Sequence, residues 1–202
     1  MVLQNRVLPS GDIIADPSRG LFTGNRGVLH DDQQRLGRAR WKGRAWIICA
    51  LEFKGWRRRV MTPGTWTELF FLDEAVALAA GHRPCALCRR AAYMAFQQGF
   101  GGLKAAEMDA VLHKARVAED RQQRRFSCEI KMLPDGSFIL HEGQPHLIHR
   151  GMAYPYDPAR YAAPVALPRG LVEVMTPEPS VEVLRSGYLP VLHPSLGSAR
   201  QA

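Results

Sequence analysis

The sequence predicts an α+β fold, in which a small mixed region of strands and two or three helices precedes an antiparallel β meander. Up to residue 125, strand-like apolar runs are followed by helical patterns, whereas residues 126–202 contain short strands separated by turns. The 202 residues are enough for one sizeable core or for a small module with a second lobe. We therefore expect a module at residues 1–125 and a β-rich lobe at residues 126–202, with packing into one domain as the alternative.

The first elements are expected to be strands after an irregular start. Glycine and proline recur through residues 1–40 and break any long element, so a loop-rich segment is expected there. Residues 46–53 and 66–71 are apolar runs rich in aromatic and β-branched side chains. They predict a β-hairpin or two neighbouring strands.

Three helices are expected next. The first begins at Leu72 or Asp73 and ends near Gly81, because glycine suits the position after a helix C-terminus. The second covers about residues 84–98 and the third about residues 104–124. The third carries apolar side chains at helical spacing: Met108, Val111, Leu112 and Ala115.

The second half alternates short apolar runs with turn residues, which predicts the meander. The expected strands are residues 126–133, 137–141, 146–149 and 171–175. A short helix over residues 180–186 is expected to end at Gly187. His141, His146 and His149 lie in this half, and we expect ordinary surface or partly buried histidines rather than a second metal site.

Positive charge is concentrated in the first part of the chain. Residues 1–126 carry 21 Lys and Arg against 12 Asp and Glu, whereas the rest carry 6 against 7. Arginine suits bidentate contact with phosphate, so we expect nucleic acid as a partner, with a solvated arginine-rich exterior as the alternative. Trp56 lies beside three arginines and is the tryptophan expected to contact a ligand. The candidate contact residues are Trp56, Arg57, Arg58, Arg59, Arg89, Arg90, Arg121, Arg124 and Arg125.

Membrane and secretion signals are absent from the sequence. No uncharged apolar run approaches the roughly 20 residues that cross a bilayer, and the N-terminus lacks the apolar core of a signal peptide. We therefore expect a cytoplasmic protein in a reducing compartment, with no membrane as partner. The sequence also lacks a Walker loop, a dinucleotide fingerprint, a nucleophile elbow and a His-Glu-x-x-His motif.

Cys85 and Cys88 form the most specific motif of the chain. They lie in the segment Gly81-His82-Arg83-Pro84-Cys85-Ala86-Leu87-Cys88, ahead of a predicted helix. Two thiolates separated by two residues can bind one tetrahedral ion, and a helix N-terminus favours negative sulfur. Zinc is therefore the expected cofactor, and two reduced thiols or a redox pair are the alternatives.

The stretch from Glu68 to Cys88 resembles the end of the zinc-binding domain of Ada-type DNA alkylation-repair proteins. The likeness consists of a strand with aromatic residues, an alanine-rich helix and Gly-x-Arg-Pro-Cys-x-x-Cys, and it covers about a tenth of the chain. In that family a second cysteine pair precedes this segment, and its first member takes a methyl group from a DNA phosphotriester. The resemblance implies that Cys49 is a third ligand and a reactive thiolate, and that the partner is DNA. The family's fourth cysteine has no counterpart here, because its place falls near Phe53.

A fourth ligand is expected from histidine. His30 lies in a glycine-rich segment that can approach a strand end, so we expect a site of three cysteines and His30. His82 and Cys128 are alternatives. An aromatic residue that binds no metal occupies the position of His82 in the resembling family, and the apolar run around Cys128 is typical of a buried thiol.

The expected function is a zinc-stabilised nucleic-acid-binding protein, linked through the resemblance to DNA repair or processing. The alternative is a metal-dependent enzyme, in which Cys49 accepts an alkyl group or a metal-bound water serves a hydrolase or nuclease. A binding domain without metal is a third hypothesis. The number of protein ligands separates them, because four close a structural site and three leave a position for water or substrate. The sequence gives no oligomeric state.

Overall fold

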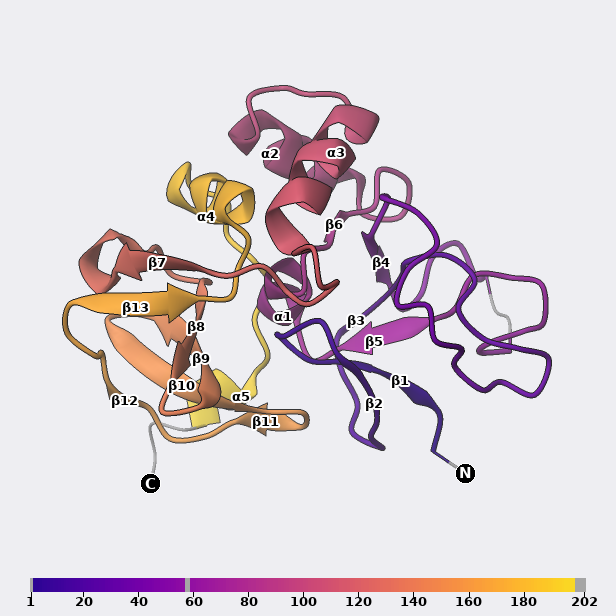
Figure 1. Ribbon diagram of the computed structural model, residues 1–202, viewed down its shortest axis with the longest axis horizontal. Helices are drawn as coiled ribbons and strands as arrows, with labels where there is room; N and C mark the ends of the chain where they lie inside the picture. The colour runs from indigo at the N-terminus through magenta and orange to yellow at the C-terminus, as the bar shows by residue number, and fades with distance from the viewer. Residues whose placement is uncertain (1, 57–58, 199–202) are drawn as a thin grey trace.

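The computed structural model describes residues 2–56 and 59–198 and has the mixed α+β architecture that the sequence predicts. Two sheets lie on either side of a short central helix, α1 (Glu74–Ala79), whose residues are all buried (Figure 1). Helices α2 (Arg90–Gly99) and α3 (Ala105–Arg116) lie together at one end of the molecule (Figure 1). No helix within the described ranges is long and apolar enough to span a membrane.

The N-terminal sheet is mixed and has the strand order β2-β1-β5-β3-β4-β6. Its strands are β1 (Gln4–Val7), β2 (Ile13–Ala15), β3 (Phe22–Asn25), β4 (Ile47–Ala50), β5 (Leu69–Phe71) and β6 (Arg83–Pro84). Two of its pairings are parallel, β1 with β5 and β4 with β6. The strand nearest the cysteine motif is therefore the edge strand β6.

One expectation for this sheet is corrected, because β3 lies between β4 and β5, which are therefore not neighbours. Residues 1–40 are rich in loops as predicted, but they also hold three of the sheet's strands. Gly24 helps β3 to pair with β4, because a Cβ at this position would lie only 2.1 Å from the carbonyl oxygen of Ile47. The glycine that reads as a breaker in the sequence allows two strands to approach closely.

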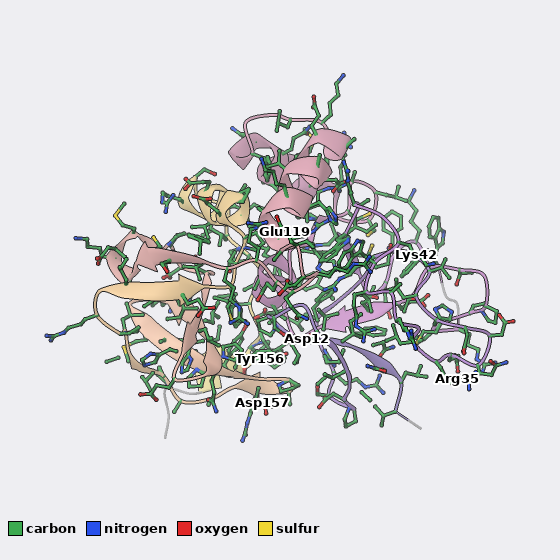
Figure 2. All side chains as sticks on the ribbon, in the orientation of Figure 1. Asp12, Arg35, Lys42, Glu119, Tyr156 and Asp157 are labelled. Atoms are coloured by element: carbon green, nitrogen blue, oxygen red, sulfur yellow. The ribbon has the colours of Figure 1, made fainter. Side chains whose placement is uncertain are left out.

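The C-terminal sheet is the predicted antiparallel meander, with strand order β11-β10-β9-β8-β13-β7 and β12 paired to β10. Its strands are β7 (Phe126–Glu129), β8 (Phe138–His141), β9 (Gln144–His149), β10 (Met152–Asp157), β11 (Arg160–Tyr161), β12 (Val165–Ala166) and β13 (Leu171–Val174). The turns Glu142-Gly143 and Arg150-Gly151 have positive φ at both residues, which is the two-residue hairpin geometry. Figure 2 labels Tyr156 and Asp157 at the far end of β10.

Helix α1 begins and ends as the sequence predicts. Asp73 accepts a hydrogen bond from the backbone N–H of Val76 at 3.0 Å and so caps the first turn. Gly81 follows the helix with a φ of +82°, a conformation that glycine adopts without strain.

Helices α2 and α3 are shorter than predicted. Helix α2 begins at Arg90 rather than at residue 84, because Arg83 and Pro84 pair with β4 and the chain needs a turn before the helix. Helix α3 ends at Arg116 rather than at residue 124. Beyond it the chain turns back through a bridge between Val117 and Gln123.

Three further helical segments complete the chain: η1 (Ile130–Met132), α4 (Glu178–Arg185) and α5 (Ser195–Ser198). Helix α4 corresponds to the predicted helix at residues 180–186. Gly187 follows it with positive φ, as expected for a residue that ends a helix.

One hydrophobic core continues across both halves of the chain. It includes Phe71 from the N-terminal sheet, Leu78 from α1, and Phe138 and Tyr154 from the C-terminal sheet, all of them buried. Residues on both sides of the predicted boundary at 125 therefore contribute to one hydrophobic core. A smaller apolar cluster lies between the C-terminal sheet and α4.

Candidate metal centre

The side chains of Cys49, Cys85 and Cys88 converge, with their sulfur atoms all within 4.8 Å of one another. Each of these thiols is free and half-buried. Two of the three are close in sequence, but Cys49 comes from a segment well ahead of them. The fold therefore brings together the three cysteines that the sequence analysis selected.

Parallel pairing of β4 with β6 explains the convergence. Ile47 pairs with Arg83 and Ile48 with Pro84, so the two strands run in register toward the same edge of the sheet. The backbone N–H of Cys85 continues this ladder by donating to the carbonyl oxygen of Ile48 at 2.9 Å. Cys49 and Cys85 thus follow adjacent positions of two neighbouring strands.

The turn between β6 and α2 holds Cys85 and Cys88 and surrounds the sulfur atoms with backbone donors. The N–H of Leu87 donates to Sγ of Cys85 at 3.4 Å, and the N–H of Ala50 donates to Sγ of Cys88 at 3.4 Å. Such donors stabilise negative sulfur. Each donor, one from the turn and one from β4, favours negative charge on the sulfur that accepts it.

The three sulfur atoms also affect one another. A hydrogen bond from the Cys49 thiol, assisted by backbone N–H groups, lowers the pKa of Cys85. The same hydrogen bond raises the pKa of Cys49, and burial raises the pKa of Cys88. Among the three sulfur atoms, Cys85 is therefore the one whose surroundings most favour negative charge.

The cysteine group fits a tetrahedral zinc ion. A zinc–sulfur bond is about 2.3 Å long, so two sulfur ligands of one ion lie about 3.8 Å apart. The sulfur atoms of Cys49, Cys85 and Cys88 already lie within 4.8 Å, so only small side-chain adjustments are needed. Over the described part of the chain this group has three members, which leaves one of four tetrahedral positions for another ligand.

His30, the expected fourth ligand, lies outside the cysteine group. The side chain is buried, and its Nδ1 lies 2.6 Å from Oγ1 of Thr67. Its Nε2 lies 3.2 Å from the carbonyl oxygen of Thr62. Both ring nitrogens are engaged, so the predicted site of three cysteines and His30 is corrected to a group of three cysteines.

The two alternative ligands also lie elsewhere. His82 is buried and accepts a hydrogen bond from Nε of Arg26 at 3.2 Å. Cys128 lies on β7, opposite Val172, and its thiol faces the carbonyl oxygen of Glu129 at 3.5 Å. Neither belongs to the cysteine group.

The histidines of the C-terminal sheet form no comparable group. The rings of His141 and His146 lie 5.4 Å apart, and Nδ1 of His146 is bonded to the carbonyl oxygen of Gln144. Throughout residues 2–56 and 59–198, the cysteine group is the one cluster with three suitably placed metal ligands.

The predicted nucleic-acid-binding residues divide into exposed and internally paired side chains. Trp56 is 68% exposed, and its ring packs edge-on against Phe53. Arg125 forms an ion pair with Glu173 at the surface. Arg57 and Arg58 lie outside the described residues. The exposed arginines among the candidates are Arg59, Arg90, Arg121, Arg124 and Arg125.

Arg89 is corrected from a candidate nucleic-acid contact to an internal residue. Its guanidinium forms a bidentate ion pair with Glu74, and the two side chains are 8% and 1% exposed. Sequence reasoning could not separate Arg89 from Arg90, because the two are adjacent and chemically identical. Arg90 begins α2 and is exposed.

A set of buried arginines is the feature that sequence reasoning missed. Arg6, Arg26, Arg83, Arg89 and Arg116 are all buried or nearly so. They account for a sizeable part of the positive charge of the first half, so less of that charge reaches the surface than the composition indicates. The sequence carries no local signal for them, since burial of an arginine depends on partners from distant segments.

Comparisons with known proteins add no relative. No protein-family model, no curated protein and no solved structure matches the chain. The resemblance of residues 68–88 to Ada-type zinc domains therefore stays a prediction, and the geometry of the three thiols is the main basis for a functional proposal.

Proposed function

We propose that this chain is a zinc-binding protein in which Cys49, Cys85 and Cys88 hold one ion, and that it binds nucleic acid through the basic surface beside that ion. The convergence of the three thiols within 4.8 Å, from two separate segments, is the observation that carries the proposal. Three thiols at this separation from distant parts of a chain, without a disulfide, are typical of a metal site.

The ion would link strand β4, through Cys49, to the turn between β6 and α2, through Cys85 and Cys88. Strand β6 is only two residues long and forms the edge of the sheet. A bond from Cys49 on β4 to Cys85 and Cys88 would hold this short strand in register and fix the start of the helix. The expected role of zinc is therefore to stabilise the fold locally.

Exposed aromatic and basic side chains flank the cysteines in the chain. Lys54 and Trp56 follow Cys49 within one loop, and Arg90 follows Cys88 by two residues. Nζ of Lys54 lies 5.5 Å from the centre of the Phe53 ring, which itself contacts Trp56. Cations beside an exposed aromatic ring suit a phosphate backbone with a stacked base.

Metal content tests the first part of the proposal. Purified protein is expected to contain one zinc per chain, and Cys85→Ser is expected to lose it. Cys128→Ser is the matched control, because that thiol lies outside the cysteine group, and it should keep full metal content. Equal zinc in both variants, or none in the native protein, would contradict the metal site.

Nucleic-acid binding is tested separately by fluorescence anisotropy with labelled duplex and single-stranded DNA and RNA. We expect the double variant Arg59→Ala, Arg90→Ala to bind more weakly, with a salt slope smaller by about 1 for each phosphate that it no longer neutralises. Trp56→Ala should weaken single-strand binding by a factor of about 5 to about 150, because stacking contributes about 1–3 kcal/mol per base. Arg169→Ala, an exposed arginine of the second half, serves as the control. If the double variant and Trp56→Ala both bind like the native chain, the basic surface has no role in binding.

A second candidate function is favoured by the position that the three cysteines leave open. A zinc-bound Cys49 thiolate could accept an alkyl group from a phosphotriester. In that step the sulfur–carbon bond forms, the carbon–oxygen bond breaks, and the phosphodiester leaves as an anion. Mass spectrometry after incubation with methylphosphotriester DNA would then show one added methyl on Cys49. An unmodified Cys49 would leave the structural role as the function of the site.

Replacement of zinc by cobalt distinguishes an open site from a closed one. If an exchangeable ligand occupies the fourth position, added azide should change the visible spectrum of the cobalt protein. A spectrum that does not respond indicates that a protein group closes the site.

A further inference from the structure

A second cluster of functional groups, which includes none of the cysteines, surrounds Trp46. The Trp46 side chain is 4% exposed and lies directly before β4. Cζ of Arg26 is 4.1 Å from the ring centre, and Cζ of Arg116 is 3.9 Å from it. Arg26 follows β3 and Arg116 ends α3, so three distant segments place two cations on one ring.

Arg26 makes hydrogen bonds only to neutral groups. Its Nε donates to Nε2 of His82 at 3.2 Å, and its Nη1 donates to the carbonyl oxygen of Gly11 at 2.9 Å. Its Nη2 is buried and has no hydrogen-bond partner among the described residues. The side chain is 2% exposed, so water does not replace the missing partner at the surface.

Arg116 has the same kind of environment. Its Nη1 donates to the carbonyl oxygen of Gly81 and its Nη2 to that of Arg44, each at 2.6 Å. Its Nε is buried and unpartnered within the described part of the chain, and the residue is 3% exposed. The second arginine is therefore also incompletely bonded.

Neither guanidinium forms an ion pair with a carboxylate in residues 2–56 or 59–198. Other buried arginines of the chain do so, since Arg83 pairs with Asp109 and Arg89 with Glu74. Burial without a counterion lowers the pKa of both Arg26 and Arg116 to about 9. Two adjacent, unpaired and buried cations are unfavourable unless an anion binds beside them.

A cavity of about 220 Å³ opens beside these groups. Its charged lining residues are Arg26, Arg40, Arg116, Arg121 and Asp12. Arg40 and Arg121 are exposed, and Asp12, labelled in Figure 2 on the turn between β1 and β2, already accepts a hydrogen bond from Ser10. Four cations against one carboxylate give the cavity an excess of positive charge. We call this cavity the arginine pocket.

We propose that the arginine pocket binds a phosphate group. Guanidinium groups recognise phosphate through charge-assisted hydrogen bonds, which are stronger in a buried site than in water. A phosphate monoester supplies close to two negative charges and several acceptor oxygens, which suit a pocket lined by four arginines and one carboxylate. The group could belong to a small phosphate ester or to the terminal phosphate of a nucleic acid. The site contains none of the cysteines and does not rest on the proposed zinc function.

Calorimetric titration of the native protein with inorganic phosphate and with a nucleoside monophosphate tests this proposal. We expect saturable binding to both. Arg40→Ala removes an exposed cation at the rim and should weaken binding about two- to fivefold. Arg116→Lys keeps the charge but removes the planar donors, and should weaken binding about tenfold or more. Arg169→Ala should leave the affinity unchanged.

Two results would overturn the proposal: no saturable binding of either phosphate compound by native protein, or binding that Arg40→Ala and Arg116→Lys both leave intact. Arg40 is exposed, so its variant keeps the test valid even if Arg116→Lys fails to fold. Oligonucleotides with and without a 5′-phosphate then identify the source. A preference for the phosphorylated strand identifies a nucleic-acid end, and equal weak binding of both strands identifies a small ester.

Discussion

Glu74 and Arg89 form a buried bidentate ion pair that joins the central helix to the turn carrying Cys88. The two nitrogen–oxygen distances are 2.7 and 2.9 Å. Glu74 also accepts hydrogen bonds from the hydroxyl of Tyr188 and from the backbone N–H of Val191. The C-terminal segment, α1 and the cysteine turn thus meet at one carboxylate.

We predict that Arg89→Met destabilises the protein by about 3–5 kcal/mol, because it leaves the Glu74 carboxylate buried without its counterion. Arg125→Met breaks the exposed pair with Glu173 and should change stability by less than about 1 kcal/mol. Urea denaturation of both variants measures the difference. Similar losses for the two would show that the buried pair has no special role.

Gly81→Ala tests the close packing behind α1. A Cβ at Gly81 would lie 2.5 Å from Cδ of Arg116, in a residue with a φ of +82°. Gly101 has a similar φ of +77° with open space around it, so Gly101→Ala reports backbone strain alone. We expect a loss of about 1–2 kcal/mol for Gly101→Ala, and a further 1–3 kcal/mol, roughly, for Gly81→Ala from overpacking. Equal losses would mean that the Arg116 side chain moves aside freely.

Acid should destabilise the fold through His82. Burial, reinforced by Arg26 and Arg116, holds the pKa of His82 well below its usual value of 6.5. The unfolded chain takes up this proton as the pH falls below 6.5 and the folded chain does not, so stability is lost in that direction. The loss approaches about 1.4 kcal/mol per pH unit until the folded pKa is reached.

His82→Gln is the variant that tests this dependence, because its side-chain oxygen can still accept from Arg26. Urea denaturation at pH 7.5 and pH 5.5 should show a smaller difference for His82→Gln than for native protein. An unchanged pH dependence would assign the acid sensitivity to other groups.

Metal removal should lower thermal stability. A ligand that binds only the folded state stabilises it by about 4 kcal/mol when its concentration is a thousand times Kd. We therefore expect the melting temperature to fall with chelator and to recover with added zinc in native protein and in Cys128→Ser. Cys88→Ser should melt at the lower temperature in both conditions. If neither chelator nor zinc changes the melting temperature of the native protein, the metal does not stabilise the fold.

Unfolding should occur in one transition, because buried side chains of both halves form one core. The hydroxyl of Tyr161 in the C-terminal sheet donates to the Asp73 carboxylate at the start of α1, at 2.8 Å, and adds a polar link. Differential scanning calorimetry should give a single peak with equal calorimetric and van't Hoff enthalpies. Two separable peaks would indicate that the two halves unfold as independent units.

Local signals predicted much of the fold. The capping residue Asp73 and the terminal Gly81 define α1, and the paired turn residues of the meander set its hairpins, because each depends on a few neighbouring residues. The three strands in residues 1–40 were missed since they are only three or four residues long and carry no clear alternation.

At the candidate site, too, short-range patterns predicted part of the arrangement and the fold decided the rest. Spacing alone identified Cys85 and Cys88, and the resemblance indicated Cys49, which the register of β4 with β6 brings beside them. The placement of His30 could not be predicted from its loop, because its ring bonds to two distant threonines and lies outside the cysteine group.

The sequence by itself determined the α+β class, the meander and the Cys85/Cys88 pair, all of which rest on short-range patterns. Tertiary structure alone decided that Arg89 is internal while Arg90 is exposed, and that Arg26 and Arg116 meet at Trp46. The physical reason is that the environment of a charged side chain is set by groups from other segments, and only the folded chain brings those groups together.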